Sequence, residues 1–250
     1  MIVTRVPSGI PGLDAVLQGG IPTNSSLALR TESSNFAEAF QQQFIAEGLK
    51  LGFPGLYCCL TRSPASVINS MNHQGFDIAE HVANDQLVFL DCYSAHKRSS
   101  SIGVDKELQD RIITVADMDD EKILQEGLAT AVERMPDIKG LRAVCENVAG
   151  VLTSRSPVEM MRWGRRAFGD LRAFQTVVLH TFPIGMRMQL FNILAPDFDG
   201  VFELKIERGT DRVRHFLGIQ KMRMTIVPPK MHELDLANGI VTLKTIQKIT

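Results

Sequence analysis

Apolar segments that read as strands alternate with amphipathic helical patterns through most of the chain. The strand-like runs lie near 26–30, 55–60, 86–92, 140–146 and 176–182. After the first run, Phe36, Phe40 and Phe44 recur on one face of a helical segment from about 36 to 49. Because parallel neighbouring strands need a crossover connection, this alternation predicts a mostly parallel, doubly wound α/β sheet with helices on both faces.

After Gly200 the pattern changes to strands separated by turns. The segments "GVFELKIER", "RVRHFLGIQKMR" and "GIVTLKTI" have strand periodicity and no helical pattern between them. They predict an antiparallel extension of the same sheet. No linker or internal repeat interrupts the chain, so we expect one domain over residues 1–250.

Composition excludes several classes of function. The formal net charge is −1, with 22% charged and 44% hydrophobic residues, which gives no global electrostatic case for nucleic acid or an anionic membrane. No apolar run approaches the roughly 20 residues that span a bilayer, and the N-terminus lacks a signal-peptide pattern, so we expect no membrane insertion.

The cysteine and histidine pattern gives no metal site. Cys58, Cys59, Cys92 and Cys145 have no metal-ligand spacing, and we expect free thiols in a reducing, cytoplasmic protein. The histidines likewise show no ligand spacing, and His180, in an apolar strand, is expected to be a core residue.

The order of landmarks resembles the KaiC-like branch of the RecA-fold ATPases, which occurs chiefly in archaea and some bacteria. The matching pieces are "RVPSGIPGLDAVLQGGIP" (5–22), "QQQFIAEGLKLG" (41–52), "SPASVINSMNHQGFD" (63–77), "FDGVFELKIE" (198–207), "RHFLGIQKMR" (214–223) and "NGIVTL" (238–243). The resemblance covers nearly the whole chain. It implies a three-layer RecA-like P-loop NTPase fold and, in ordinary members of the family, a site for ATP and Mg²⁺.

The phosphate-binding loop of that family has the pattern G-x-x-x-x-G-K-[ST], and the corresponding stretch of this chain, residues 31–38, contains neither its glycines nor its lysine. In the family, its glycines bring backbone N–H groups to the phosphates, its lysine reaches the β- and γ-phosphates, and its hydroxyl binds Mg²⁺. The resemblance places Thr31, Ser34 and Phe36 at the glycine positions, Ala37 at the lysine and Glu38 at the hydroxyl. We therefore expect a degenerate nucleotide loop.

Two further catalytic features of the family are also altered. Thr61 and Arg62 stand where the resemblance places a pair of glutamates, one of which activates the attacking water. Glu146, followed by Asn147, stands where the family has the aspartate that orders Mg²⁺. The carboxylate is kept, but the hydrolytic glutamates are lost.

The late strand keeps one family feature. Lys221 and Arg223 match a Lys-x-Arg that, in the family, reaches the nucleotide of a neighbouring subunit. The resemblance thus makes them candidates for an inter-subunit contact. The alternative is that they are simply solvated strand residues.

The stretch "NFAE" (35–38) predicts how the N-terminus of the helix after the degenerate loop is capped. It matches a capping box with Asn35 as N-cap and Glu38 three residues later. A carboxylate would then meet the partial positive charge that binds phosphate elsewhere. Glu32 and Glu38 would repel a polyphosphate.

These features together predict a non-catalytic pseudo-ATPase with no catalytic residues, no metal and no bound cofactor. We expect a regulatory or scaffolding role, in a homo-oligomer or with an active paralogue as protein partner. One alternative is an atypical ATPase that binds ATP and Mg²⁺ weakly. A second is a recombinase-like DNA-binding paralogue, for which the arginine-bearing helix with Arg162, Arg165, Arg166 and Arg172 is the candidate surface; a solvated helix face is the alternative.

Overall fold

The protein is built on a large mixed β-sheet. The computed structural model describes residues 3–94, 106–117, 120–149, 156, 158–159, 162, 176–186 and 188–244. Within these residues the main sheet has ten strands. In spatial order they are β12 (Ile240–Leu243), β11 (Met231–Ala237), β10 (Val213–Met222), β9 (Gly200–Arg208), β3 (Ser25–Thr31), β8 (Val177–Pro183), β7 (Arg142–Cys145), β4 (Gly55–Cys59), β5 (Leu87–Asp91) and β6 (Ile113–Thr114).

The strands from β9 to β6 all run parallel, and the antiparallel part begins at the β9–β10 pair. This confirms the predicted parallel strands and the predicted change of pattern. One detail of the prediction is wrong, because β9 pairs parallel with β3 rather than antiparallel. The reason is a helical crossover before β9, formed by α10 (Met188–Leu194) and the 3₁₀ turn η2 (Ala195–Asp197), which sequence periodicity did not reveal.

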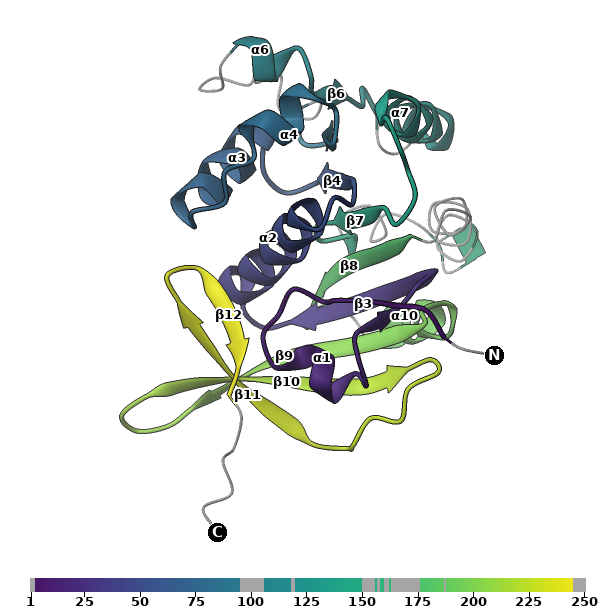
Figure 1. Ribbon diagram of the computed structural model, residues 1–250. Helices are drawn as coiled ribbons and strands as arrows, with labels where there is room; N and C mark the ends of the chain where they lie inside the picture. The colour runs from purple at the N-terminus through teal and green to yellow at the C-terminus, as the bar shows by residue number, and fades with distance from the viewer. Residues whose placement is uncertain are drawn as a thin grey trace.

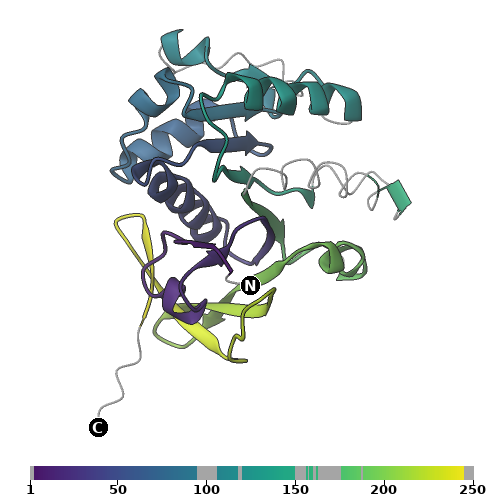
Figure 2. The ribbon, with the colours of Figure 1, turned by 45° about the vertical axis from the view of Figure 1, so that its right-hand side comes forward.

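Helices cover both faces of the sheet, as the sequence predicts. One face carries α2 (Ser34–Lys50), α3 (Pro64–His73) and α4 (Ala79–Ala83), and the other carries α7 (Glu121–Arg134) and α10, as Figures 1 and 2 show. Alternate residues of each strand face the two layers: Tyr57 packs with the α2 side and Leu56 with the α7 side. Two hydrophobic layers therefore enclose one continuous sheet.

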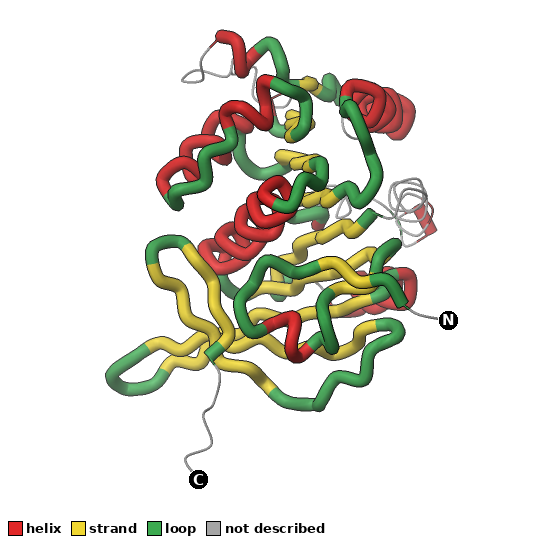
Figure 3. Tube along the Cα trace, in the orientation of Figure 1, coloured by secondary structure: helices red, strands yellow, loops and turns green. Residues whose placement is uncertain are grey.

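The N-terminal segment closes the antiparallel end of the sheet. Strands β1 (Arg5–Val6) and β2 (Ile21–Pro22) pair with each other, and the short helix α1 (Leu13–Val16) lies between them in the chain. The Leu243 N–H donates to the Pro11 carbonyl at 2.9 Å, which joins this segment to β12. Figure 3 shows the segment lying over the yellow strands of this end.

Some predictions fall on other parts of the chain. The polar segment 94–111 contains the short helix α6 (Lys106–Gln109), and the rest of it lies largely outside the described residues. The arginine-bearing helix lies outside them too, apart from a few residues that include Arg162. Among the described helices, none is long and apolar enough to cross a membrane.

Candidate functional site

The residues singled out by the family resemblance meet at the carboxyl ends of β3, β4 and β7. Thr61 and Arg62 follow β4, Glu146 follows β7, and Glu38 lies on the α2 helix that follows β3. The carboxyl edge of parallel strands is the usual position of ligand sites in open α/β sheets.

The start of α2 differs from the predicted capping box. The helix begins at Ser34, and its N-cap is Ser33, whose hydroxyl accepts the Phe36 N–H at 3.5 Å. The Thr31 hydroxyl accepts the Ser33 N–H at 2.9 Å and donates to the Ser33 carbonyl at 2.6 Å. These bonds hold Ser33 in extended backbone, which is the conformation that an N-cap requires. The prediction of Asn35 as N-cap is therefore wrong; Asn35 is an exposed residue of the first turn.

Phe36 and Ala37 face the protein interior. Their exposed fractions are 6% and 5%, and both belong to the core on the α2 side. The Phe36 ring stacks on the His215 ring of β10, with centroids 3.9 Å apart and planes 20° apart. Burial lowers the pKa of His215, so the neutral imidazole is favoured in this contact. The position aligned with the family's lysine thus points into apolar packing.

Glu38 is turned toward α3 and the end of β4 and does not bond back to the start of its own helix. Its carboxylate pairs with the Arg62 guanidinium, accepts the Ser70 hydroxyl at 2.7 Å and accepts the side-chain amide of Gln42 at 3.2 Å. The second half of the predicted capping box is therefore wrong as well. Glu38 pairs with Arg62 instead, because a hydrogen bond to a charged partner is stronger than one to a backbone N–H.

Glu146 is the most buried charge of the site. Its side chain is 3% exposed and accepts the Tyr57 hydroxyl at 2.9 Å and the Thr61 hydroxyl at 3.1 Å, while Arg62 completes its shell. Glu38, Tyr57, Thr61, Arg62 and Glu146 form what we name the Arg62 cluster. One guanidinium thus bridges the carboxylates of α2 and β7.

The protonation states within the Arg62 cluster follow from burial and charge. Burial, followed by the charge of Glu146, raises the pKa of the Tyr57 hydroxyl well above its ordinary value, so Tyr57 keeps its proton and donates it. Burial is the largest single influence and lowers the pKa of Arg62, but the charges of Glu146 and Tyr57 and the hydrogen bonds to Glu146 and Glu38 together outweigh it and raise that pKa. Arg62 is therefore a permanent cation.

Sequence reasoning missed Tyr57 and Ser70 as members of this site. Tyr57 lies in an apolar segment whose pattern predicts only a buried strand, but a buried tyrosine hydroxyl needs a hydrogen-bond partner. An arginine directly after an apolar strand was the signal that could have revealed a carboxylate partner. The identity of that partner depends on sheet order, which places β4 beside β7.

Two residues beside the Arg62 cluster, Glu32 and Asn147, are also hydrogen-bonded to neighbouring strands. The Glu32 carboxylate accepts the Ile206 N–H of β9 at 2.8 Å and so lies on the neighbouring strand. The Asn147 N–H donates to the Thr181 hydroxyl at 2.7 Å, with Asn147 at a φ of 39°. These contacts fix the backbone on both sides of the Arg62 cluster.

Lys221 and Arg223 lie at the opposite edge of the sheet. Met222 pairs with Gly200 at the start of β9, so these residues are at the amino end of the parallel strands. Lys221 donates to the Ala195 carbonyl at 2.9 Å, and Arg223 pairs with the buried Asp199 at 2.7 Å. Both side chains remain exposed. Their role between subunits stays a prediction.

The cysteines are free thiols, as the sequence predicts, and His180 is fully buried in β8. Within the part of the chain that the structure describes, no group of histidine, cysteine and acidic side chains could hold a metal ion.

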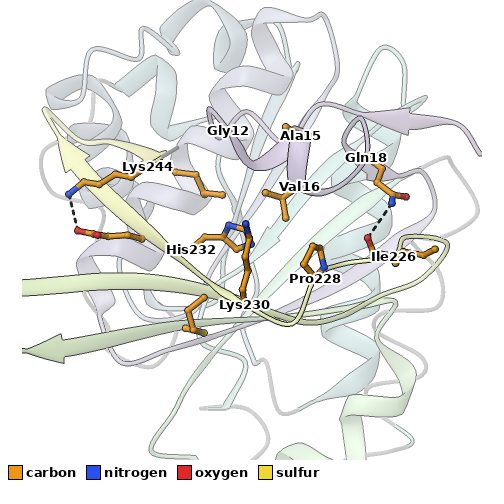
Figure 4. A pocket seen from close by; sticks show the side chains of 12 residues that line it. Gly12, Ala15, Val16, Gln18, Ile226, Pro228, Lys230, His232 and Lys244 are labelled. Carbon is orange, nitrogen blue, oxygen red and sulfur yellow. Dashed lines mark hydrogen bonds and ion pairs between the residues drawn. The ribbon is translucent and has the colours of Figure 1, made fainter. Parts of the chain in front are cut away.

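A cavity of about 460 Å³ lies between α1 and the strands β11 and β12, away from the Arg62 cluster. Figure 4 shows Val16 and Gln18 on one side of it and Lys230 and His232 on the other. Burial, followed by the charge of Lys230, lowers the pKa of His232. The cavity volume falls within the range of small-molecule sites.

Comparisons with family models, with related sequences and with solved structures all point to one protein family. The family model described as "ATPase: KaiC" matches residues 6–248. A UPF0273 protein of Pyrococcus furiosus is 26% identical over 96% of this chain and 94% of its own length, and one of Pyrococcus horikoshii is 28% identical over 95% and 93%. The crystal structure of a KaiC-like protein from Pyrococcus horikoshii OT3 superposes with a TM-score of 0.76 at 17% identity, and the match covers 98% of this chain and 100% of that one. That last likeness shows the fold.

The matched residues include every strand of the main sheet, from β3 to β12, and both edges on which the candidate residues lie. The resemblance seen in the sequence and the α/β architecture agree with that match. The chain belongs to the KaiC family of RecA-fold proteins.

Proposed function

We propose that this chain is a pseudo-ATPase of the KaiC family, which has no ATP turnover and acts as a regulatory or scaffolding protein through protein partners. The observation that carries the proposal is the bridging position of Arg62 between Glu38 and Glu146. In the family, these two positions hold the oxygens that order Mg²⁺. Here the guanidinium occupies those oxygens.

The chemistry of the two cations supports this proposal. Mg²⁺ needs oxygen ligands in near-octahedral geometry, usually carboxylates, waters and substrate phosphates. The Glu146 oxygens already accept bonds from Tyr57, Thr61 and Arg62. A metal would have to displace a permanent cation that is attached to the chain. We therefore expect Mg²⁺ to bind between Glu38 and Glu146 only when Arg62 is absent.

The helix start supports it as well. A polyphosphate needs free backbone N–H groups at the N-terminus of the helix and a loop that can wrap around it. At this end Ser33 caps the helix, Thr31 bonds its own loop, and the Phe36 and Ala37 side chains are buried. The Glu38 carboxylate adds repulsion. No lysine lies in this segment to offset the phosphate charge.

Assembly is the remaining part of the proposal. The exposed Lys221 and Arg223 make this edge a candidate contact with another copy or with an active paralogue. Such a head-to-tail contact produces rings or filaments. The four free thiols support a reducing, cytoplasmic setting.

Titration calorimetry with Mg·ATP tests the nucleotide part. We expect no heat of binding for the wild type, and no phosphate release by protein purified free of contaminating ATPases. A dissociation constant tighter than about 1 mM, or hydrolysis that follows the protein peak, would instead establish the atypical ATPase.

Light scattering and a pull-down of the native protein test the assembly part. A Lys221→Glu/Arg223→Glu variant should lose self-association or the co-purifying partner, because the substitutions reverse the charge of the contact. A strict monomer with no co-purifying homologue would contradict a scaffolding role.

A further inference from the structure

Two cysteines lie side by side on neighbouring strands of the sheet. Cys58 of β4 and Cys145 of β7 are direct register partners in a parallel pair, and Cys145 is in turn the partner of His180 in β8. The Glu146 N–H donates to the Cys58 carbonyl at 3.3 Å, so the two backbones are joined at this point. Register and backbone bonding place the three side chains in one row across the sheet.

This row lies on the opposite face of the sheet from the Arg62 cluster. Cys58 packs in the hydrophobic layer on the α7 side and Cys145 packs against it, whereas Cys59 faces the α2 side. Cys145 is half-buried, while the other cysteines are buried. Cys145 is therefore the most exposed of the four cysteine residues.

The two sulfur atoms are not equivalent. The interaction with the neighbouring Cys58 thiol, aided by His180 and opposed by burial, lowers the pKa of Cys145 to about 5. The same interaction and burial raise the pKa of Cys58 well above its ordinary value. Cys145 is thus suited to be the attacking thiolate, and Cys58 the resolving thiol.

We propose that Cys58 and Cys145 form a peroxide-responsive dithiol, in which oxidation of Cys145 leads to a reversible disulfide between β4 and β7. This site is independent of the proposed loss of ATP turnover. The oxidant is a hydroperoxide, of which hydrogen peroxide is the simplest.

The reaction balances in two steps. The Cys145 thiolate attacks one peroxide oxygen, the O–O bond breaks, and hydroxide leaves and takes up a proton to become water, so that the sulfur becomes a sulfenic acid. Cys58 then attacks that sulfur, the S–S bond forms, the S–O bond breaks, and water leaves with the Cys58 proton. Two thiols lose two electrons and two protons, and one peroxide becomes two waters.

Strand geometry permits the bond but does not favour it. Neighbouring strands lie about 4.8 Å apart, which is within the range of Cα separations found for disulfides. A disulfide directly across a parallel pair is constrained by both strands, and strained disulfides are easily reduced. The expected product is therefore a labile disulfide that thiol reductants reverse.

Cys92 provides an internal comparison. Cys92 lies in the same hydrophobic layer as Cys58. Burial is the main cause that raises the pKa of Cys92 to about 12. Because the pKa of Cys145 is lowered and that of Cys92 is raised, we expect Cys145 to be oxidised faster than Cys92 at pH 7.

Peptide mapping of the full chain tests the proposal. The reduced protein is treated with hydrogen peroxide, its remaining thiols are blocked with N-ethylmaleimide, and it is digested without reduction for mass spectrometry. We expect the Cys58–Cys145 disulfide to be the main product, and dithiothreitol to restore both thiols. Cys58→Ser should accumulate a sulfenic acid at Cys145, which dimedone traps.

Two variants separate reactivity from structure. Cys145→Ser should abolish disulfide formation, and the matched control Cys59→Ser, one residue from Cys58 but on the other face, should leave it unchanged. Intact thiols in the peroxide-treated wild type would overturn the proposal, and so would a disulfide that joins other cysteines. Equal rates of oxidation for Cys145→Ser and wild type would also overturn it.

Discussion

Replacing Arg62 by Met removes the cation of the Arg62 cluster and keeps most of the side-chain length. The change leaves Glu146 with a side chain that is 3% exposed and without its charged partner. Breaking a buried ion pair on one side typically costs about 3–5 kcal/mol. Arg62 is itself 26% exposed, and Tyr57 and Thr61 remain as donors to Glu146, so we expect a loss of about 2–3 kcal/mol in unfolding free energy.

A double-mutant cycle assigns that loss to its partner. Urea unfolding is measured for Arg62→Met, Glu146→Gln and the double variant, and the coupling energy is compared with that of a second cycle through Glu38→Gln. The Glu38 side chain is 25% exposed, so we expect its coupling with Arg62 to stay below about 1 kcal/mol. The Glu146 coupling should be about twice as large or more, because its charge is desolvated.

The surface arginine Arg111 gives the control. Its side chain is 43% exposed and pairs with Asp85, so Arg111→Met should change stability by no more than about 0.5 kcal/mol. The reasoning is refuted if Arg62→Met also falls within that limit, or if the two coupling energies of Arg62 are equal.

Three further outcomes follow from other parts of the structure. Ser33→Ala should lower the unfolding free energy by about 0.5–1 kcal/mol in urea melts, since it removes the N-cap of α2. Burial and Lys230 lower the pKa of His232, so the unfolded state binds more protons and wild-type stability should fall as pH drops below about 6.5; melts of His232→Asn at several pH values should show a smaller slope. Ala37→Lys should lower the melting temperature without any phosphate release, because position 37 is buried in the core.

The fold was largely accessible from the sequence because periodicity reports burial. The strand positions and the α2 helix follow from apolar spacing, and the family resemblance implies their arrangement. The parallel pairing of β9 was not accessible, since it depends on the short crossover helix α10, whose apolar run of a few residues has no distinct period.

The candidate site was accessible only in part. The positions aligned with the family's loop and carboxylates lie at one edge of the sheet, but the sequence did not reveal the contacts that they make there. Ser33 and Asn35 are both good capping residues, and the bonds that Thr31 makes with Ser33 decided between them. The partners of Arg62 come from α2 and β7, so only the three-dimensional order of the strands could identify them.

The cation at the centre of the Arg62 cluster is a side chain, and this has a consequence for how its surroundings respond to the cell. A dissociable ligand stabilises a protein by an amount that grows with the logarithm of its free concentration. Arg62 has no free concentration, because it is covalently part of the chain that follows β4, and it is therefore always present at this site. The order of α2, β4 and β7 at this edge should therefore be the same in starved and well-fed cells, whatever their supply of nucleotide or magnesium.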